Sequence, residues 1–155
     1  MPDIPTTAAG GPLSYAIFQL ARAHRGCAAA LLREMDLHPG QELLLMQLLD
    51  RDGQTQSELL DSVGLDHSTV SKSLRRMQDA GLLVREPAAH DRRVMVVHLT
   101  DKGRAMREPI AALWRTLEEA SARNLSERQM KSFLRTAYAI TEAINSRALP
   151  QYEAP

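Results

Sequence analysis

The chain contains little of what several protein classes depend on, because it has one cysteine, one tryptophan and no net charge in 155 residues. A single cysteine excludes a disulfide within the chain. No apolar run approaches the roughly 20 residues that a membrane span needs, and the sequence does not open with a charged region followed by a hydrophobic core. We therefore expect neither an anchor nor a signal peptide, a cytoplasmic location and a single domain.

Sequence features of enzymes and metal sites are also scarce. Gly10, Gly11 and Gly40 are isolated and follow no predicted strand, so they do not form a nucleotide-binding loop. No Ser/His/Asp set and no pair of carboxylates stands in a catalytic motif. His24 and Cys27 could share a metal ion, but zinc needs three or four converging ligands. We expect no enzymatic activity, no cofactor and no metal site.

The centre of the sequence has the spacing of a helix-turn-helix. Thr55 and Glu58 fit a capping box, which begins a short helix. Gly64 suits the left-handed conformation that ends a helix, and residues 66–68 give the next start signal. A short helix, a tight turn and a second helix are therefore expected between residues 55 and 80.

The second of these helices, which Gly81 ends, has one apolar face and one polar, basic face. Val70, Leu74 and Met77 recur at i, i+4 and i+7, so they should pack on the rest of the domain. The other face carries hydroxyls and cations, which suit the base edges and phosphates of DNA. Its residues are Ser68, Thr69, Ser71, Lys72, Arg75 and Arg76.

Two short apolar and β-branched runs, 82–86 and 94–99, follow this helix and predict a two-stranded wing. The loop between them is basic at its tip, where Arg92 and Arg93 could enter a narrow minor groove. Asp91 would orient one of these arginines through a salt bridge.

Charge is distributed unevenly along this neutral chain. Residues 67–107 contain nine lysines and arginines against four aspartates and glutamates, a net charge of +5, so the remainder carries −5. A basic segment of this kind is the electrostatic footprint of a nucleic-acid-binding protein, and it predicts binding that weakens with salt.

Helical patterns flank the winged region. Apolar residues keep helical spacing over 13–35, and a second helix is expected over 41–50. A long helix should run from residue 100 past residue 120, with a bend at Pro109, and a last helix should begin at the Ser126 capping box.

The last helix carries a wide apolar stripe that no later chain could cover. We expect a second subunit to cover it, the alternative being packing within the monomer. The stripe consists of Met130, Phe133, Leu134, Ala137, Ile140 and Ile144. The expected fold is mainly α with a small two-stranded β wing, a winged helix-turn-helix flanked by dimerisation helices.

In this order and spacing, the motifs from Leu37 to Met106 resemble the MarR family of winged helix-turn-helix transcription regulators. The motifs that carry the resemblance are Gln41, Thr55-Gln56-Ser57-Glu58-Leu59, Ser68-Thr69-Val70-Ser71-Lys72, Arg76-Met77 with Gly81-Leu82, Asp91-Arg92-Arg93 and Leu99-Thr100-Asp101-Lys102-Gly103-Arg104. The expected organisation is a disordered arm at 1–11, a single domain at 12–149 and a tail at 150–155. Within that domain, dimerisation helices at 12–36 and 104–147 flank the winged helix-turn-helix at 40–103.

The resemblance implies a homodimer that holds two recognition helices about 34 Å apart over a pseudo-palindromic operator in double-stranded DNA. It further implies a repressor that leaves DNA when it binds a small effector, which in this family is often aromatic or phenolic. The residues expected to contact DNA are Gln54, Thr55, Gln56, Ser57, His67, Ser68, Thr69, Ser71, Lys72, Arg75, Arg76, His90, Asp91, Arg92 and Arg93.

By the same resemblance, the effector would bind between the dimer helices and the winged domain, although packing or solvated roles remain the alternative for each candidate. The candidates are Tyr15, His24, Arg25, His38, Met46 and Trp114. Cys27 is expected to be a buried, inert thiol, with a peroxide-sensing thiol as the alternative. A winged-helix module that binds protein instead of DNA is a further alternative, but it would be expected to lose the wing arginines and the cations of the second helix.

Overall fold

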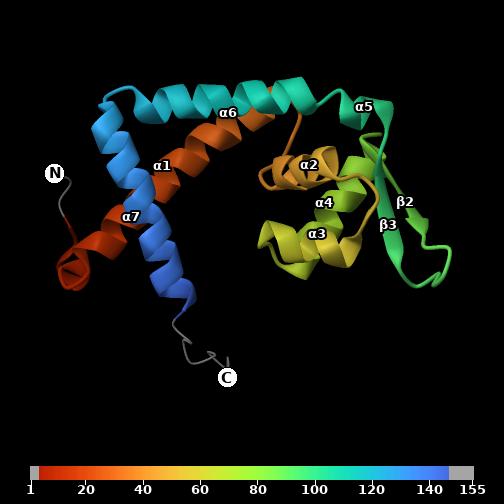
Figure 1. Ribbon diagram of the computed structural model, residues 1–155, viewed down its shortest axis with the longest axis horizontal. Helices are drawn as coiled ribbons and strands as arrows, with labels where there is room; N and C mark the ends of the chain where they lie inside the picture. The colour runs from red at the N-terminus through yellow and green to blue at the C-terminus, as the bar shows by residue number, and fades with distance from the viewer. Residues whose placement is uncertain (1–3, 147–155) are drawn as a thin grey trace. The chain divides into compact units, whose positions relative to one another are not determined.

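The computed structural model describes residues 4–146 (Figure 1). The predicted tail at 150–155, the first three residues of the predicted arm and residue 147 of the last predicted helix lie outside this range. The described residues form two compact units that divide between Leu117 and Glu118. Among these residues, no helix is both long enough and apolar enough to cross a bilayer.

The first unit holds the winged region and the helices on either side of it. Its elements are η1 (Thr6–Ala8), α1 (Pro12–Glu34), α2 (Gln41–Asp50), β1 (Gln54–Thr55), α3 (Gln56–Val63), α4 (His67–Asp79), β2 (Leu83–Pro87), β3 (Met95–Leu99), α5 (Asp101–Arg104) and the greater part of α6 (Arg107–Ala122). Helices α3 and α4 pack together, and the β2–β3 hairpin lies beside them (Figure 1). A short 3₁₀ turn, η1, lies within the predicted arm.

The helix-turn-helix predicted from residues 55–80 is confirmed. The Thr55 hydroxyl accepts the Glu58 amide at 3.1 Å, and the Glu58 carboxylate accepts the Thr55 amide at 2.7 Å, which completes the capping box. Gly64 ends α3 at a φ of 63°. The apolar stripe of α4 is buried, with Val70, Leu74 and Met77 each at most 1 % exposed.

The core of the first unit is rich in leucine. Leu44, Leu45 and Leu48 of α2 are at most 1 % exposed, as are Leu59 of α3 and Leu83 of β2. Burying one such side chain contributes about 1.5–3 kcal/mol. This core holds α3, α4 and the sheet in fixed positions relative to one another, so polar groups on their outer faces are presented on a rigid support.

The predicted wing hairpin is present, and a third strand joins it. Strands β2 and β3 are antiparallel, with Leu83 opposite Leu99, and β1 pairs with the other edge of β3, with Gln54 opposite Val97. A two-residue strand gives too short a pattern to be recognised from alternation. It ties the start of α3 to the wing.

The long helix expected from residue 100 is wrong. The structure breaks it at Ala105 and Met106 into the short α5 and α6. The expected bend at Pro109 is also wrong, because this proline lies in the first turn of α6. An amide in that turn has no partner within the helix, so a proline there removes no hydrogen bond.

The second unit consists of the end of α6 and α7 (Glu127–Asn145). The predicted capping box at its start is confirmed, since the Ser126 hydroxyl accepts the Gln129 amide at 3.3 Å and the Gln129 side chain accepts the Ser126 amide at 2.9 Å. No residue of α7 is buried, and Phe133, Leu134 and Ile144 are 50 %, 48 % and 56 % exposed. Within its own unit, α7 therefore leaves half of its apolar stripe exposed and half of it partly exposed.

Candidate nucleic-acid interface

The first turn of α4 is organised by Asp66, which caps the helix. Its Oδ1 accepts the Thr69 amide at 2.9 Å and the Ser68 hydroxyl at 2.7 Å, and its Oδ2 accepts the Thr69 hydroxyl. These hydrogen bonds hold the pKa of Asp66 well below its ordinary value of 3.8, the Thr69 hydroxyl contributing most. Asp66 is therefore a carboxylate at any pH near neutrality.

A second hydrogen bond joins α3 to α4 on the same side of the unit. The Gln56 side-chain amide donates from Nε2 to the Ser71 hydroxyl at 2.9 Å. The structure thus brings together Gln56, from the first turn of α3, and Ser71, from the outward side of α4. Both residues were predicted to contact DNA.

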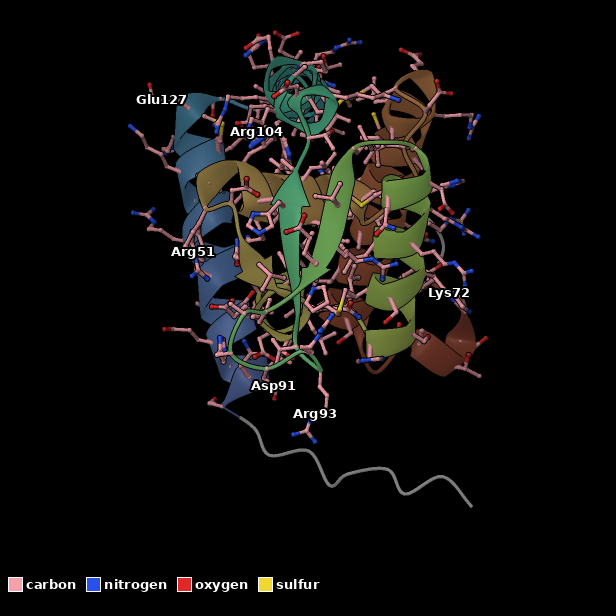
Figure 2. The ribbon with its side chains drawn as sticks, turned by 90° about the vertical axis from the view of Figure 1, so that its right-hand side faces the viewer. Arg51, Lys72, Asp91, Arg93, Arg104 and Glu127 are labelled. Carbon is pink, nitrogen blue, oxygen red and sulfur yellow. The ribbon has the colours of Figure 1, made fainter. Side chains whose placement is uncertain are left out.

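Cations surround these hydroxyls. Lys72, Arg75 and Arg76 of α4 are exposed, and so are Arg92 and Arg93 at the wing; we call these five residues the basic face. Figure 2 shows Lys72 on the outer side of α4, and Arg93 extending away from the tip of the wing. Exposed cations keep their hydration until a partner arrives, so they are available to phosphates.

The wing tip is ordered by Asp91, as the sequence predicted. Asp91 Oδ1 accepts the Arg93 amide at 2.9 Å and lies 3.4 Å from Arg93 Nε. The Arg93 side chain is nevertheless 93 % exposed, and His90 and Arg92 beside it are exposed as well. The carboxylate therefore aims the arginine without covering it (Figure 2).

A depression of about 260 Å³ lies between α3, α4 and the wing. Its lining includes five of the residues predicted to contact DNA, which come from three separate segments of the chain: Thr55, Gln56, Ser57, His67 and Arg93. The tertiary fold thus gathers these groups into one surface, as a double helix would require.

Gln54 is the predicted DNA contact that the structure does not bring to this surface. Its side chain is 3 % exposed, and its Nε2 donates to the backbone carbonyls of Gln47 at 2.8 Å and Arg51 at 2.6 Å. It holds the end of α2 against β1, which is a structural role. The sequence did not predict this burial, because a polar residue next to a helix cap is ordinarily expected to be exposed.

The predicted effector residues are only partly brought together. Trp114 Nε1 donates to Met46 Sδ at 3.1 Å, which joins α6 to α2. Tyr15, His24 and Arg25 lie along α1, where the ten steps from Tyr15 to Arg25 span about 15 Å of helix.

The remaining effector candidate, His38, is exposed in the connection between α1 and α2. Within residues 4–146, no three histidine, cysteine, aspartate or glutamate side chains come together as a metal site.

The expectation that Cys27 is buried is wrong for the single chain, in which it is exposed. Along α1 only Leu32 is buried, while Leu13, Phe18 and Leu20 are 59 %, 56 % and 53 % exposed. The alanines beside Cys27 suggested a packed position, but small apolar residues are equally compatible with a helix face that the single chain leaves open.

The sequence predicted that Asp66 helps to start a helix, but not that it bonds to Ser68 and Thr69. The available signal was an aspartate followed at the second and third positions by hydroxyl residues. An aspartate that caps a helix there can also receive those hydroxyls.

The fold and this surface define a winged helix-turn-helix protein. The sequence profile of the MarR family matches residues 35–94. The regulator MgrA of Staphylococcus aureus is 27 % identical over 134 residues, which cover 86 % of this chain and 90 % of MgrA. Over residues 35–94 the chain is thus similar to the MarR family, and over most of its length it is similar to a curated transcriptional regulator, in agreement with the resemblance drawn from its motifs.

Solved structures agree on the fold. A mutant of MarR from E. coli, complexed with operator DNA, superposes with a TM-score of 0.79 at 20 % identity and covers 88 % of this chain and 99 % of its own. BpsR of Bordetella bronchiseptica, whose structure concerns regulation of DNA binding by 6-hydroxynicotinic acid, gives 0.77 at 17 % identity, over 86 % of this chain and 95 % of BpsR.

Proposed function

We propose that this protein is a homodimeric, sequence-specific DNA-binding regulator, which represses transcription until a small effector releases it from its operator. The observation that carries the proposal is the basic face, five exposed lysine and arginine side chains on α4 and the wing, beside hydroxyl groups held at the start of α4. A helix of this character suits the major groove, and an exposed wing arginine suits the minor groove.

In this proposal each part of the surface has its own role. The hydroxyls of Ser68, Thr69 and Ser71 meet base edges, while the α4 cations meet phosphates and Arg92 and Arg93 enter the minor groove. Thr55, Gln56 and Ser57 offer amides and side chains to a phosphate at the start of α3. DNA as the partner also implies a cytoplasmic location.

Different observations support the dimer and the effector as parts of this proposal. The partly exposed apolar stripe of α7 fits a contact with a second copy, which would hold two α4 helices one turn of DNA apart. The BpsR structure supports an effector that is a small aromatic acid. The exposure of Cys27 favours a second candidate, a regulator released by oxidation of this thiol.

A gel-shift assay tests the proposal. The purified protein is titrated on the DNA just upstream of its own reading frame at two salt concentrations, with and without aromatic acids, peroxide and zinc. We expect salt-sensitive binding by a dimer and release by one additive. Release by peroxide that a Cys27→Ser variant resists would favour the thiol candidate. Absence of binding to this DNA and to random DNA at low salt would favour a protein-binding module.

A further inference from the structure

We infer that Asp66 is a specificity-determining residue, because it takes the hydroxyl protons of Ser68 and Thr69 and leaves both oxygens as acceptors toward the bases of DNA. The recognition helix then selects adenine or cytosine, the bases with an exocyclic amino group, at the positions these oxygens face. This inference rests on the proposed function, and it adds which bases that surface prefers.

The hydrogen-bond pattern determines the direction of each bond. Asp66 Oδ1 receives the Ser68 hydroxyl at 2.7 Å and the Thr69 amide at 2.9 Å, while Oδ2 receives the Thr69 hydroxyl. A carboxylate has no proton to donate, so the proton in each hydroxyl bond must belong to Ser68 or Thr69. Each hydroxyl oxygen keeps its lone pairs and has no proton left for another partner.

Base edges in the major groove distinguish such an acceptor from a donor. Adenine presents an amino group at N6 and cytosine at N4, whereas guanine and thymine present acceptors at O6 and N7 or at O4. An oxygen without a free proton binds the amino groups and meets the carbonyls with its lone pairs. On the strand that Ser68 and Thr69 face, adenine and cytosine are therefore favoured over guanine and thymine.

Ser71 has the opposite arrangement on the same helix. Its oxygen accepts from Gln56 Nε2 at 2.9 Å, so its own proton is free to be donated to DNA. Ser71 should therefore favour a base carbonyl or a phosphate, and the two ends of the recognition surface would read with opposite polarity.

The variant Asp66→Asn tests this inference. Asparagine keeps an oxygen at Oδ1, which still accepts the Thr69 amide and the Ser68 hydroxyl, but it places an NH₂ group at Oδ2, which donates to the Thr69 hydroxyl and frees the proton of that hydroxyl. Operator preferences are measured by selection from randomised DNA for the wild type, Asp66→Asn, Ser68→Ala and Thr69→Val. Positions that lose their preference in the Ser68 and Thr69 variants are the ones to compare.

At those positions we expect the wild type to prefer adenine and cytosine over guanine and thymine by roughly tenfold, the worth of about 1.4 kcal/mol. Asp66→Asn should remove or reverse this ratio at the position that depends on Thr69 and keep it at the position that depends on Ser68, because only the Thr69 hydroxyl lies against Oδ2. Asp101→Asn is the matched control, because it removes the same charge from the first turn of α5. It should leave the ratio unchanged.

If the preference at the Thr69-dependent position survives in Asp66→Asn, with affinity altered equally for all sequences, Asp66 is only a helix cap and the inference is overturned. A wild-type preference for guanine or thymine at those positions would also overturn it. A wild type that enriches no sequence at all would instead contradict the proposed function.

A second measurement does not depend on the folding of the variant. The wild type is titrated on an operator in which purine, which lacks the amino group, replaces the selected adenine, or pyrimidin-2-one replaces the selected cytosine. Binding should weaken roughly tenfold, and the Ser68→Ala or Thr69→Val variant that lacks the contact should not distinguish the two operators. Equal binding of the wild type to both operators would overturn the inference.

Discussion

Two arginines of the first unit have similar ion pairs and are expected to have different functions. Arg93 pairs with Asp91 at the wing at 3.4 Å, and Arg115 pairs with Glu108 on α6 at 2.6 Å. Both pairs are exposed, and exposed pairs contribute about 0–1 kcal/mol to folding. The value of the wing pair therefore lies in holding the guanidinium in a direction suited to the minor groove.

We predict that Arg93→Gln weakens operator binding while leaving the free energy of unfolding within about 0.5 kcal/mol of the wild type. Because one cation that displaces counterions from the DNA is lost, the slope of log K against log salt concentration should fall by about one. Titrations at four or more salt concentrations measure the slope. Arg115→Gln is the control and should keep the wild-type slope. An unchanged slope in Arg93→Gln would count against the minor-groove role.

At the residue scale, the sequence predicted exposed charges and local bonds better than hydrogen-bond partners that are distant in the chain. The α4 cations and the Asp91–Arg93 pair could be predicted, because solvated charges and local bonds depend on near neighbours in the chain. Gln54 could not, since its partners are carbonyls of α2 that folding brings to it. The direction of the Ser68 hydrogen bond depends on the position of the Asp66 carboxylate in the folded chain.

The turn that leads from β3 into α5 ties the wing to the helices. The Thr100 hydroxyl donates to the Gly81 carbonyl at 2.6 Å and accepts the Gly103 amide at 3.1 Å, while the Thr100 amide donates to the Leu82 carbonyl at 3.1 Å. A Cβ at Gly103 would lie 2.0 Å from the Leu82 oxygen. Glycine is required here because two backbones approach each other closely.

We predict that Gly103→Ala destabilises the protein by about 1–3 kcal/mol, because backbone must move to admit the methyl group. Gly26→Ala is the matched control, since Gly26 lies inside α1 with nothing within 4 Å of an added Cβ. It should be neutral or stabilising by about 0.5–1 kcal/mol. Urea unfolding of the two variants measures both values, and equal stabilities would contradict the close approach.

The same turn explains why the long helix could not be predicted correctly. Residues 101–108 contain no proline and are compatible with a helix, so local signals place no break there. The break follows from Gly103 lying against Leu82 while Met106 packs on the core. The contact between Gly103 and Leu82 joins residues 21 positions apart, which the helical periodicity of the sequence does not indicate.

At the scale of the whole molecule, the notable feature is apolar surface that the single chain leaves uncovered. Helix α7 buries no residue, and α1 buries only Leu32. Large apolar side chains on both helices remain about half exposed or more, among them Phe18, Phe133 and Tyr138. Surfaces of this kind mark interaction sites in soluble proteins, which is why a homodimer is part of the proposed function.

We predict that Phe133→Lys converts the protein from a dimer of twice 17.2 kDa to a monomer at micromolar concentration, because a charge would be buried unpaired in the interface. Sedimentation equilibrium measures the mass. Ala139→Lys adds the same charge to an exposed position on the other side of α7 and should remain dimeric. If both variants keep the wild-type mass, the α7 stripe is not the contact between subunits.

The sequence alone determined the helix-turn-helix followed by the wing hairpin, both capping boxes, the buried stripe of α4 and the uneven charge, because each depends on residues close to one another in the chain. Only the tertiary structure decided that β1 joins the wing, that the predicted long helix breaks, that Gln54 is buried and that Asp66 holds two recognition hydroxyls. Those features depend on the three-dimensional positions of particular atoms, which local patterns do not specify.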